Sequence, residues 1–339
     1  MRESKMLKFY FLRDKQFDSI FILLPMFVGI FSALICVWQP KAFLYILFMD
    51  FWLLAYHHVI SSYTRIAFDW ESIKSNSFLV LGLPLLVFVG VIGFYSSFGI
   101  WVLVTISFYW QWYHYTRQSY GIARYYIAQE RKSNNPLLHP IHTLALYSLP
   151  ITGILYRSWQ APETFIFLKL WVIPISYEIV IISAFLSAIL IALQLYSWWK
   201  LYLNEELNGG YVAYMLSHYS MFIIGHFLID DINFGWLAMN VWHNMQYIIF
   251  VWLKNNQIYS GGIDYKHLLI SKISQNGKMW LYILVCLGIT LCIYIPLYYI
   301  TEKAQEGTSI AIAFIVFITI NFHHYIVDSV IWKRKVVKI

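Results

Sequence analysis

About ten long apolar stretches dominate this sequence, and they decide its fold class. A helix needs roughly 20 apolar residues to cross the hydrocarbon core of a bilayer. In lipid, only helices and closed barrels satisfy all of their own backbone hydrogen bonds. The sequence therefore predicts an all-α, polytopic integral membrane helix bundle with about ten transmembrane helices. The stretches are 19–38, 42–65, 78–95, 98–127, 137–157, 178–203, 211–230, 232–252, 279–300 and 309–332.

The composition agrees with a membrane protein. Of the 339 residues, 60% are hydrophobic and only 12% are charged, whereas a soluble domain has roughly 45–50% and 25%. The polar loops are too short to form a separate soluble domain, so we expect residues 1–339 to be a single transmembrane domain. The three cysteines, Cys36, Cys286 and Cys292, lie in apolar stretches without disulfide or metal-ligand spacing.

Lysines and arginines predict the orientation of the chain, because short cytoplasmic loops carry the positive excess. With the N-terminus inside, the basic segments that fall in the cytoplasm are 65–74, 124–132, 200–206, 254–278 and 333–338. The opposite loops include the acidic pair Asp230 and Asp231. We therefore expect both termini in the cytoplasm, in a bacterial inner membrane. The net charge of +7 then reflects topology and contact with anionic lipid, and it does not indicate nucleic-acid binding.

Histidines are the unusual feature of the apolar stretches. At about 1.5 Å of rise per residue, several of them reach one layer in the cytoplasmic half of the bilayer. A single histidine in a membrane helix is usually a hydrogen-bonding residue, and we assign His139, His142 and His226 to that class. Histidines from several helices at one depth instead indicate a functional polar centre. Its candidate metal ligands are His57, His58, His114, His218, His243, His323 and His324.

The last stretch places two adjacent histidines on different faces of one helix. His324 shares its face with Asp328, because residues four apart lie on the same side. His323 points about 100° away. We therefore expect His324 to be a direct ligand and Asp328 to ligate or orient it. His323 is expected to be either a ligand of a second metal or a hydrogen bonder to a neighbouring helix.

The second stretch repeats this pattern with a carboxylate seven residues before a histidine. On a regular α-helix, Asp50 and His57 share a face, while His58 faces Ser62 and Arg65. A carboxylate or amide beside an imidazole fixes the tautomer of the ring and aims its free nitrogen at a metal. The spacing therefore predicts that Asp50 supports a histidine of the site.

The types of ligand indicate which metal the site would hold. Imidazoles without thiolates suit iron, copper or zinc. A site inside the bilayer favours chemistry on a lipid or another apolar molecule, and iron with dioxygen is a usual way to attack an unactivated C–H bond. We expect a transition metal, with one or two iron ions as the leading choice and zinc or haem as alternatives.

Other polar residues of the same stretches complete the predicted site. The expected catalytic residues are Asp328, Asp50 and Tyr247. The basic side chains at the cytoplasmic mouth would bind the headgroup or carboxylate of a substrate; they are Arg65, Arg117 and Arg124. The predicted function is a metal-dependent membrane oxidoreductase or oxygenase of lipid metabolism, served by an electron-donor protein.

Two other classes of function use the same residues. A transporter of protons or metal ions would use the histidines and aspartates as a relay, although such folds often show repeats and broken helices. A haem-binding membrane protein would use paired axial histidines on opposed helices. Zinc-dependent hydrolysis is a further variant of the metal site.

The histidine segments resemble, in style, a known class of membrane enzymes. The segments "AYHHVISSYTR", "YHYTRQSYG", "VWHNMQY" and "FHHYIVD" resemble those of the membrane desaturases and hydroxylases, in which histidine clusters hold two irons. The HxxxH and HxxHH boxes of that class are absent from these segments, so no residue role is transferred. The carotenoid-cleaving membrane oxygenases, also histidine-dependent, are similar in the same general way.

The predicted orientation can be tested with reporter fusions. Fusions at Ile339 and near Lys8 should both report a cytoplasmic location, and a fusion near Glu302 should report the opposite side. The physical reason is the excess of lysine and arginine in the segments placed inside. A C-terminus outside the cytoplasm would contradict the layer of histidines, because their depths are counted from the basic ends.

Overall fold

The chain is all-α apart from one small hairpin. The computed structural model describes residues 7–130, 135–306 and 311–332, and most of these are helical. Arg131, Lys132 and the basic segment 333–338, which contributed to the predicted orientation, lie outside the described residues. The chain divides into two compact units, which are unit 1 (Met1–Phe43 and Phe108–His243) and unit 2 (Leu44–Ser107 and Asn244–Ile339).

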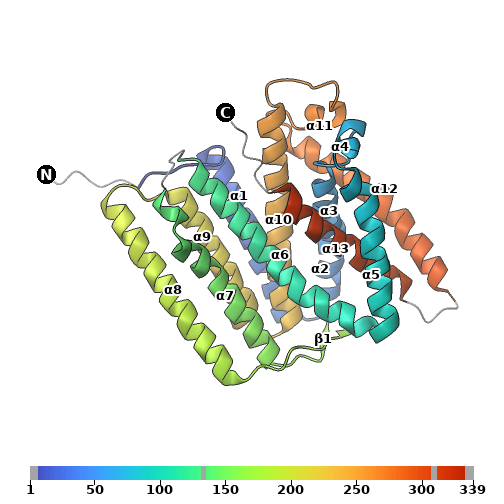
Figure 1. The fold of residues 1–339 in the computed structure, drawn as a ribbon, viewed down its shortest axis with the longest axis horizontal. Helices are drawn as coiled ribbons and strands as arrows, with labels where there is room; N and C mark the ends of the chain where they lie inside the picture. The colour runs from blue at the N-terminus through green and yellow to red at the C-terminus, as the bar shows by residue number, and fades with distance from the viewer. Residues whose placement is uncertain (1–6, 131–134, 307–310, 333–339) are drawn as a thin grey trace. The chain divides into compact units, whose positions relative to one another are not determined.

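Each unit has its own set of helices (Figure 1). Unit 1 contains α1 (Lys15–Trp38), η3 (Pro136–Leu138), α7 (Pro140–Trp159), β1 (Thr164–Phe165), β2 (Leu168–Lys169), α8 (Tyr177–Leu203), α9 (Gly209–Ile223) and η4 (Ile224–Leu228). Unit 2 contains η1 (Phe51–Ala55), α3 (Tyr56–Tyr63), α4 (Trp70–Ser75), η2 (Phe78–Gly82), α5 (Leu83–Phe98), α11 (Leu268–Ile273), α12 (Met279–Gln305) and α13 (Ile312–Ile331). Residues of both units occur in α2 (Ala42–Asp50), α6 (Ile100–Ala128) and α10 (Ile232–Tyr259).

Among the described residues, six helical segments are long and apolar enough to cross a membrane. They are Lys15–Trp38, Ala42–Tyr63, Phe78–Phe98, Tyr177–Leu203, Met279–Gln305 and Ile312–Ile331. The other four predicted stretches are also largely helical, in α6, α7, α9 and α10, but they are richer in polar side chains. The prediction of an all-α chain with membrane-spanning helices is confirmed at this level.

In unit 1, α7 packs against both α8 and α9, and α9 also packs against α1 (Figure 1). Local chemistry sets where α9 begins: the Asn208 side chain accepts hydrogen bonds from the amides of Gly210 and Tyr211. The same side chain donates to the carbonyl of Tyr126 at 3.0 Å. One side of α8 is exposed and apolar, with residues such as Phe185, as expected of a face that meets lipid.

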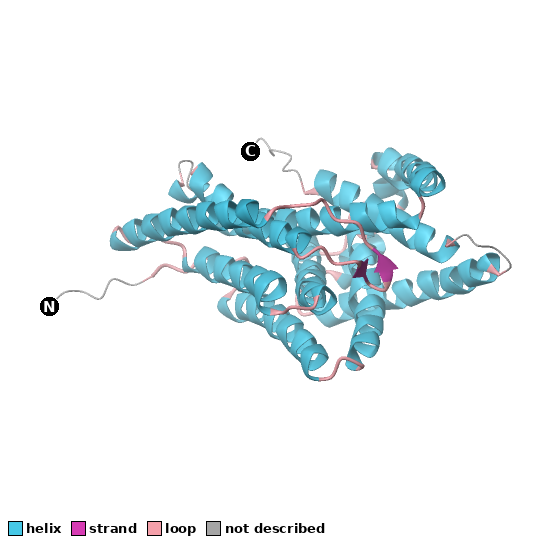
Figure 2. Ribbon diagram, turned by 90° about the horizontal axis from the view of Figure 1, so that it is seen from below, coloured by secondary structure: helices cyan, strands magenta, loops and turns pink. Residues whose placement is uncertain are grey.

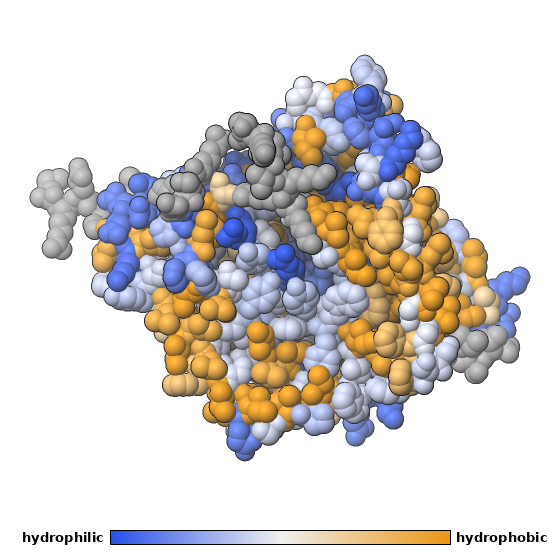
Figure 3. Space-filling view, viewed as in Figure 1, coloured by the Kyte–Doolittle hydropathy of each residue, from blue (hydrophilic) through white to orange (hydrophobic). Residues whose placement is uncertain are grey.

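In unit 2, α13 packs against α3, α5 and α12. A small apolar core of Ile66, Leu83 and Val327 holds α5 and α13 together beyond the end of α3. Figure 3 shows the surface of this unit as apolar along α5 and hydrophilic where α4 and α11 lie. This separation is expected of a bundle whose long helices lie in lipid and whose short helices lie in water.

Among the described residues, three segments are π-helical, namely η1, η2 and η4. A π-turn contains one residue more than an α-turn, so it rotates the side chains that follow it. Such turns occur frequently at functional sites. In this chain η1 directly precedes the segment with His57 and His58, and η4 contains His226.

The segment after α7 forms a two-stranded antiparallel hairpin, β1 with β2, shown in magenta in Figure 2. Its two turn residues, Ile166 and Phe167, have positive φ angles of 46° and 64°. Left-handed backbone suits a tight hairpin, but it is unfavourable for a β-branched residue such as isoleucine. The amide of Ile166 is held by the side chain of Asn233 at 2.7 Å, which helps to fix the turn.

A polar contact fastens α4 to the start of α11. His267 Nδ1 lies 2.7 Å from Asp69 Oδ2, and Asp69 also accepts from the Ser72 amide at 2.8 Å. Burial alone would raise the pKa of Asp69, but the hydrogen bonds from His267 and Ser72 outweigh burial and hold the pKa below its usual value. The ionised carboxylate is therefore the form that this contact stabilises.

Replacing Asp69 should produce a pH-dependent loss of stability. Folding lowers the pKa of Asp69, so its ionised carboxylate stabilises the folded state. This stabilisation is full above the unfolded pKa of about 3.9, and it is lost as the pH falls through the folded pKa. Asp69→Asn should reduce the free energy of unfolding by at most about 1 kcal/mol at pH 6. The difference from the wild type should shrink below about pH 4. Thermal unfolding in detergent between these pH values measures it, and Glu71→Gln, at a neighbouring exposed carboxylate, is the control.

Candidate functional site

Two buried histidines from different helices meet in unit 2. His58 lies near the start of α3, and His324 lies in the second half of α13. Their Nε2 atoms are 2.7 Å apart, and each side chain is only 2% exposed. The ring planes are nearly perpendicular, at 81°, with centroids 4.5 Å apart. The two imidazoles therefore belong to one buried site.

Asp328 lies beside this pair, one turn after His324 on α13. Its Oδ1 atom accepts hydrogen bonds from Tyr247 Oη at 2.5 Å and from Ser62 Oγ at 3.1 Å. Its Oδ2 atom is 3.6 Å from His324 Nε2. The carboxylate is thus held by two donors on one oxygen while the other oxygen faces the histidines. This agrees with the predicted shared face of His324 and Asp328.

Asn244 connects His58 to Asp50. Its Oδ1 atom is 2.8 Å from His58 Nδ1, and its Nδ2 atom donates to Asp50 Oδ1 at 3.4 Å. The sequence predicted that Asp50 and His57 share a face, but in the structure Asp50 and His58 reach the same amide. The cause is η1, because its π-turn between Asp50 and the histidines adds one residue to the turn.

The hydrogen bonds favour one assignment of the ring hydrogens. Asn244 Oδ1 can only accept, so His58 Nδ1 is the donor and His58 Nε2 keeps its lone pair. Ser62 Oγ donates its hydrogen to Asp328, so it can only accept from His324 Nδ1, which lies 3.0 Å away. With the hydrogen of His324 on Nδ1, its Nε2 atom carries a lone pair. Two lone pairs at 2.7 Å repel each other unless a cation lies between or beside them. The assignment follows from the hydrogen-bond network.

Arg65 is linked to the same network through Trp332. The guanidinium lies 5.8 Å from the centre of the Trp332 ring, and Nη1 donates to Asn255 Oδ1 at 2.8 Å. Trp332 Nε1 in turn donates to Tyr247 Oη at 3.2 Å. Two of the predicted residues, Arg65 and Tyr247, are therefore joined by one aromatic side chain.

A second pair of predicted ligands lies in unit 1. The rings of His114 and His243 are 4.9 Å apart, and the ring of Tyr115 is 4.3 Å from His243. Both histidines are buried. Gln118 Nε2 donates to the backbone carbonyl of His243 at 3.2 Å. This pair belongs to unit 1, whereas His58, His324 and Asp328 belong to unit 2.

The remaining predicted ligands have hydrogen bonds to the backbone. His323 lies 2.9 Å from Tyr63 Oη through Nδ1 and 2.7 Å from the Leu79 carbonyl through Nε2, so both ring nitrogens are occupied. His323 was expected either to bind a second metal or to form hydrogen bonds with a neighbouring helix, and these contacts fit the second role. His57 Nδ1 is 3.3 Å from the carbonyl of Leu53, one turn earlier in the chain.

The other predicted residues of unit 1 show no metal-binding geometry in their described contacts. His218 Nε2 lies 3.0 Å from the Leu146 carbonyl. Arg117 lies 5.0 Å from the centre of the Tyr120 ring, and Arg124 is partly exposed. For these arginines a role in substrate binding rests on the sequence alone.

Three side chains of the site had no predicted role, namely Ser62, Asn244 and Trp332. Each of them is three or four residues from a predicted site residue, and this spacing could have indicated that it belongs to the site. Ser62 is four residues after His58, Asn244 is three before Tyr247, and Trp332 is four after Asp328. Periodicity shows which residues share a face, but it does not show which helix that face meets.

Compared with known proteins, the chain matches no family model, no curated protein and no solved structure. Its function is therefore inferred from the donor atoms of unit 2. The ligand atoms that His58, His324 and Asp328 offer all lie within 4.8 Å of one another. They are two imidazoles and a carboxylate, each held by a hydrogen-bond partner, and this set is suited to a divalent transition metal.

The hydroxyl of Tyr247 should be important for the stability of this site. Tyr247→Phe removes a donor from a buried carboxylate and an acceptor from Trp332. We expect the free energy of unfolding to fall by about 1–3 kcal/mol. Tyr298→Phe, which removes an exposed hydroxyl, should have almost no effect. Denaturant or thermal unfolding of both variants in the same detergent tests this, and equal effects would contradict a special role for the Tyr247 hydroxyl.

Proposed function

We propose that unit 2 contains the active site of a metal-dependent membrane oxidoreductase, with His58, His324 and Asp328 as metal ligands. The observation that carries the proposal is that the Nε2 atoms of two buried imidazoles lie 2.7 Å apart, with a carboxylate oxygen 3.6 Å from one of them. Three donors of this kind, with no competing cation among them, favour a bound metal ion.

The donor set favours iron over the alternatives. Two histidines and one carboxylate that leave open positions are typical of non-haem iron oxygenases. Zinc in catalytic sites also uses three protein ligands, so it is the nearest competitor. Haem needs axial histidines on either side of a large flat ring, whereas the Nε2 atoms of His58 and His324 lie too close together for a ring to fit between them.

The residues around the ligands have roles of their own. Asn244 and Ser62 hold the tautomers of His58 and His324, and Tyr247 donates a hydrogen bond to Oδ1 of Asp328. Such partners orient ligands, and their removal typically weakens metal binding 10–100-fold. When bound, iron would supply the activation of dioxygen, and the electrons would come from a donor protein.

An apolar cavity lies along the helices that carry the ligands. It has a volume of about 50 Å³ and is lined by α12 and α13 together with the segment 52–56. Tyr56 is two residues before His58, and Phe317 is seven residues before His324, about 10 Å along α13. Aromatic side chains dominate its lining, including Trp52 and Tyr294. We propose that the substrate is a lipid or another apolar molecule that approaches from this side.

Arg65 would bind the polar end of such a substrate. It lies on a partly exposed segment after α3, and it contacts Trp332, which is bonded to Tyr247. A guanidinium on an aromatic face retains donors for a carboxylate or phosphate. Arg117 and Arg124 are proposed for the same role from their positions in the sequence.

Proton transfer is the competing function for the same residues. A continuous chain of hydrogen bonds runs through unit 2, and its members are Asp50, Asn244, His58, His324, Ser62, Asp328 and Tyr247. A proton shared between the two Nε2 atoms would satisfy the same lone pairs as a metal. A proton or ion transporter is therefore the second candidate, and the metal content of the protein separates it from the first.

The membrane arrangement also belongs to the proposal. We propose about ten spans in a bacterial inner membrane, with both termini in the cytoplasm, on the basis of the lysine and arginine distribution. The partly polar helices α6, α7, α9 and α10 would then lie inside the bundle, where protein neighbours satisfy their side chains.

The metal content of purified variants tests the site. Protein purified in detergent without a polyhistidine tag should contain iron by elemental analysis. His58→Ala and His324→Ala should each abolish the bound metal, and Asp328→Asn should weaken binding at least about 10-fold. The reason is that each of the three side chains contributes one of few donor atoms.

His323→Ala is the matched control, because it removes the adjacent imidazole from the same helix. His323 contacts Tyr63 and the Leu79 carbonyl instead, so its replacement should leave the metal in place. Protein that contains no metal, but that shows proton uptake abolished by His324→Ala, would favour the transporter.

A further inference from the structure

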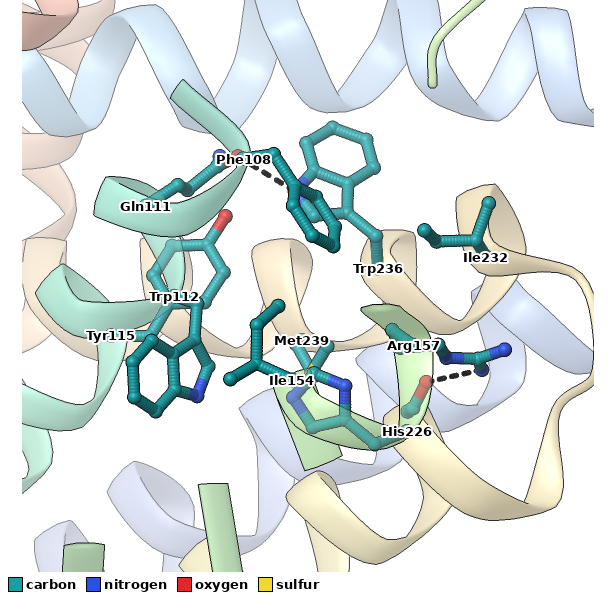
Figure 4. A pocket seen from close by; sticks show the side chains of 11 residues that line it. Phe108, Gln111, Trp112, Tyr115, Ile154, Arg157, His226, Ile232, Trp236 and Met239 are labelled. Atoms are coloured by element: carbon teal, nitrogen blue, oxygen red, sulfur yellow. Dashed lines mark hydrogen bonds between the residues drawn. The ribbon is translucent and has the colours of Figure 1, made fainter. Parts of the chain in front are cut away.

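A second cavity lies in unit 1, between α6, α7, η4 and α10 (Figure 4). Its volume of about 20 Å³ is enough for one water molecule. Apolar side chains such as Phe108, Ile154 and Met239 form much of its wall. The imidazole of His226 and the indole of Trp112 also line it, from different helices.

His226 and Trp112 bring unsatisfied polar atoms to this cavity. Both ring nitrogens of His226 and Nε1 of Trp112 are buried and have no hydrogen-bond partner in the part of the chain that the structure describes. His226 is only 3% exposed. Buried polar atoms without partners destabilise a fold, and they are rare unless a water or ligand satisfies them. Three such atoms around one cavity therefore indicate a bound molecule.

Neighbouring polar residues at this cavity are already satisfied by the protein. Gln111 accepts from Trp236 Nε1 at 3.0 Å. Arg157 donates to the carbonyls of Gly225 and Ile229 at the end of η4. Because this guanidinium is engaged by carbonyls, the cavity has no spare cation to attract an anion. The molecule that fills it is expected to be neutral.

Two close approaches of the backbone shape this cavity. A Cβ atom at Gly153 would lie 2.3 Å from His226 Cδ2, so only glycine leaves room for the imidazole. A Cβ atom at Gly235 would lie 2.1 Å from the Gly225 carbonyl, the same oxygen that Arg157 binds. The ring of His226 is therefore held in place by its surroundings, although its nitrogens have no partner.

The unsatisfied atoms specify the chemistry of the bound group. Trp112 Nε1 can only donate, and a neutral imidazole offers one donor and one acceptor. A hydroxyl group can accept from Trp112 and also exchange a hydrogen bond with His226. We propose that this cavity binds a small neutral molecule through a hydroxyl group that bridges Trp112 and His226. Because the cavity has room for about one water molecule, this hydroxyl is that of a bound water.

A double-mutant cycle tests whether one molecule bridges the two side chains. His226→Leu and Trp112→Phe each remove a partner of the hydroxyl. His226→Leu nearly conserves the side-chain volume, and Trp112→Phe replaces the indole with a smaller ring. If the molecule is shared, each single variant should lower the unfolding temperature by about 2–4 °C, and the double variant should lower it little further. Met239→Leu changes an apolar side chain of the same cavity and is the control. Unfolding is measured on the full chain in detergent.

Two probes of the same shape test whether an organic alcohol can take the place of this water. Because the cavity has room for about one water molecule, cyclohexanol and cyclohexane should change the unfolding temperature of the wild type equally, and His226→Leu should not alter this result. A stabilisation by cyclohexanol alone that His226→Leu abolishes would overturn the assignment to water.

Additive effects of the two substitutions, or single variants as stable as the wild type, would overturn the proposal. If either variant fails to fold, a high-resolution density map of the wild-type protein decides instead. A density peak within hydrogen-bonding distance of both Trp112 Nε1 and His226 supports the proposal, and an empty cavity overturns it. None of these outcomes depends on the metal site of unit 2.

Discussion

A polar side chain inside an apolar helix bundle can form hydrogen bonds only with other groups of the protein, and this constraint governs the centre of unit 2. Its histidines, aspartates and asparagine come from four helices, α2, α3, α10 and α13, and each satisfies the next. If one bond in such a chain is lost, a buried group is left without a partner, which is more unfavourable than never having had the pair. The packing of α3, α10 and α13 in unit 2 and the geometry of the candidate site therefore depend on each other.

Much of the fold could be predicted from the sequence, because its signals are local. Long apolar stretches predicted helices, and the four-residue spacing of His324 and Asp328 predicted their shared face. The separation of His323 from His324 also followed from helical phase. These predictions needed only the geometry of one helix at a time.

The rest of the site depends on contacts between helices, which spacing does not reveal. Asn244 was overlooked because its role depends on its position opposite His58 and Asp50 rather than on its own helix face. His226 was treated as an ordinary hydrogen-bonding residue, yet neither of its nitrogens has a partner among the described residues. The six helices that are most apolar were the easiest to recognise as spans, whereas α9 and α10 are more polar because protein surrounds them.

The π-turn η1 makes the identity of the site histidine depend on the backbone conformation before it. Five residues, Phe51–Ala55, occupy this turn. If they formed a regular α-helix instead, the following segment would rotate by about 100° relative to Asp50. His58 would leave the site, and His57, seven residues after Asp50, would take its place. A chain with two adjacent histidines at this point therefore keeps an imidazole in the site in either conformation. Loss of one residue from the turn would instead leave the role with His58, because a regular helix would then place it seven residues after Asp50.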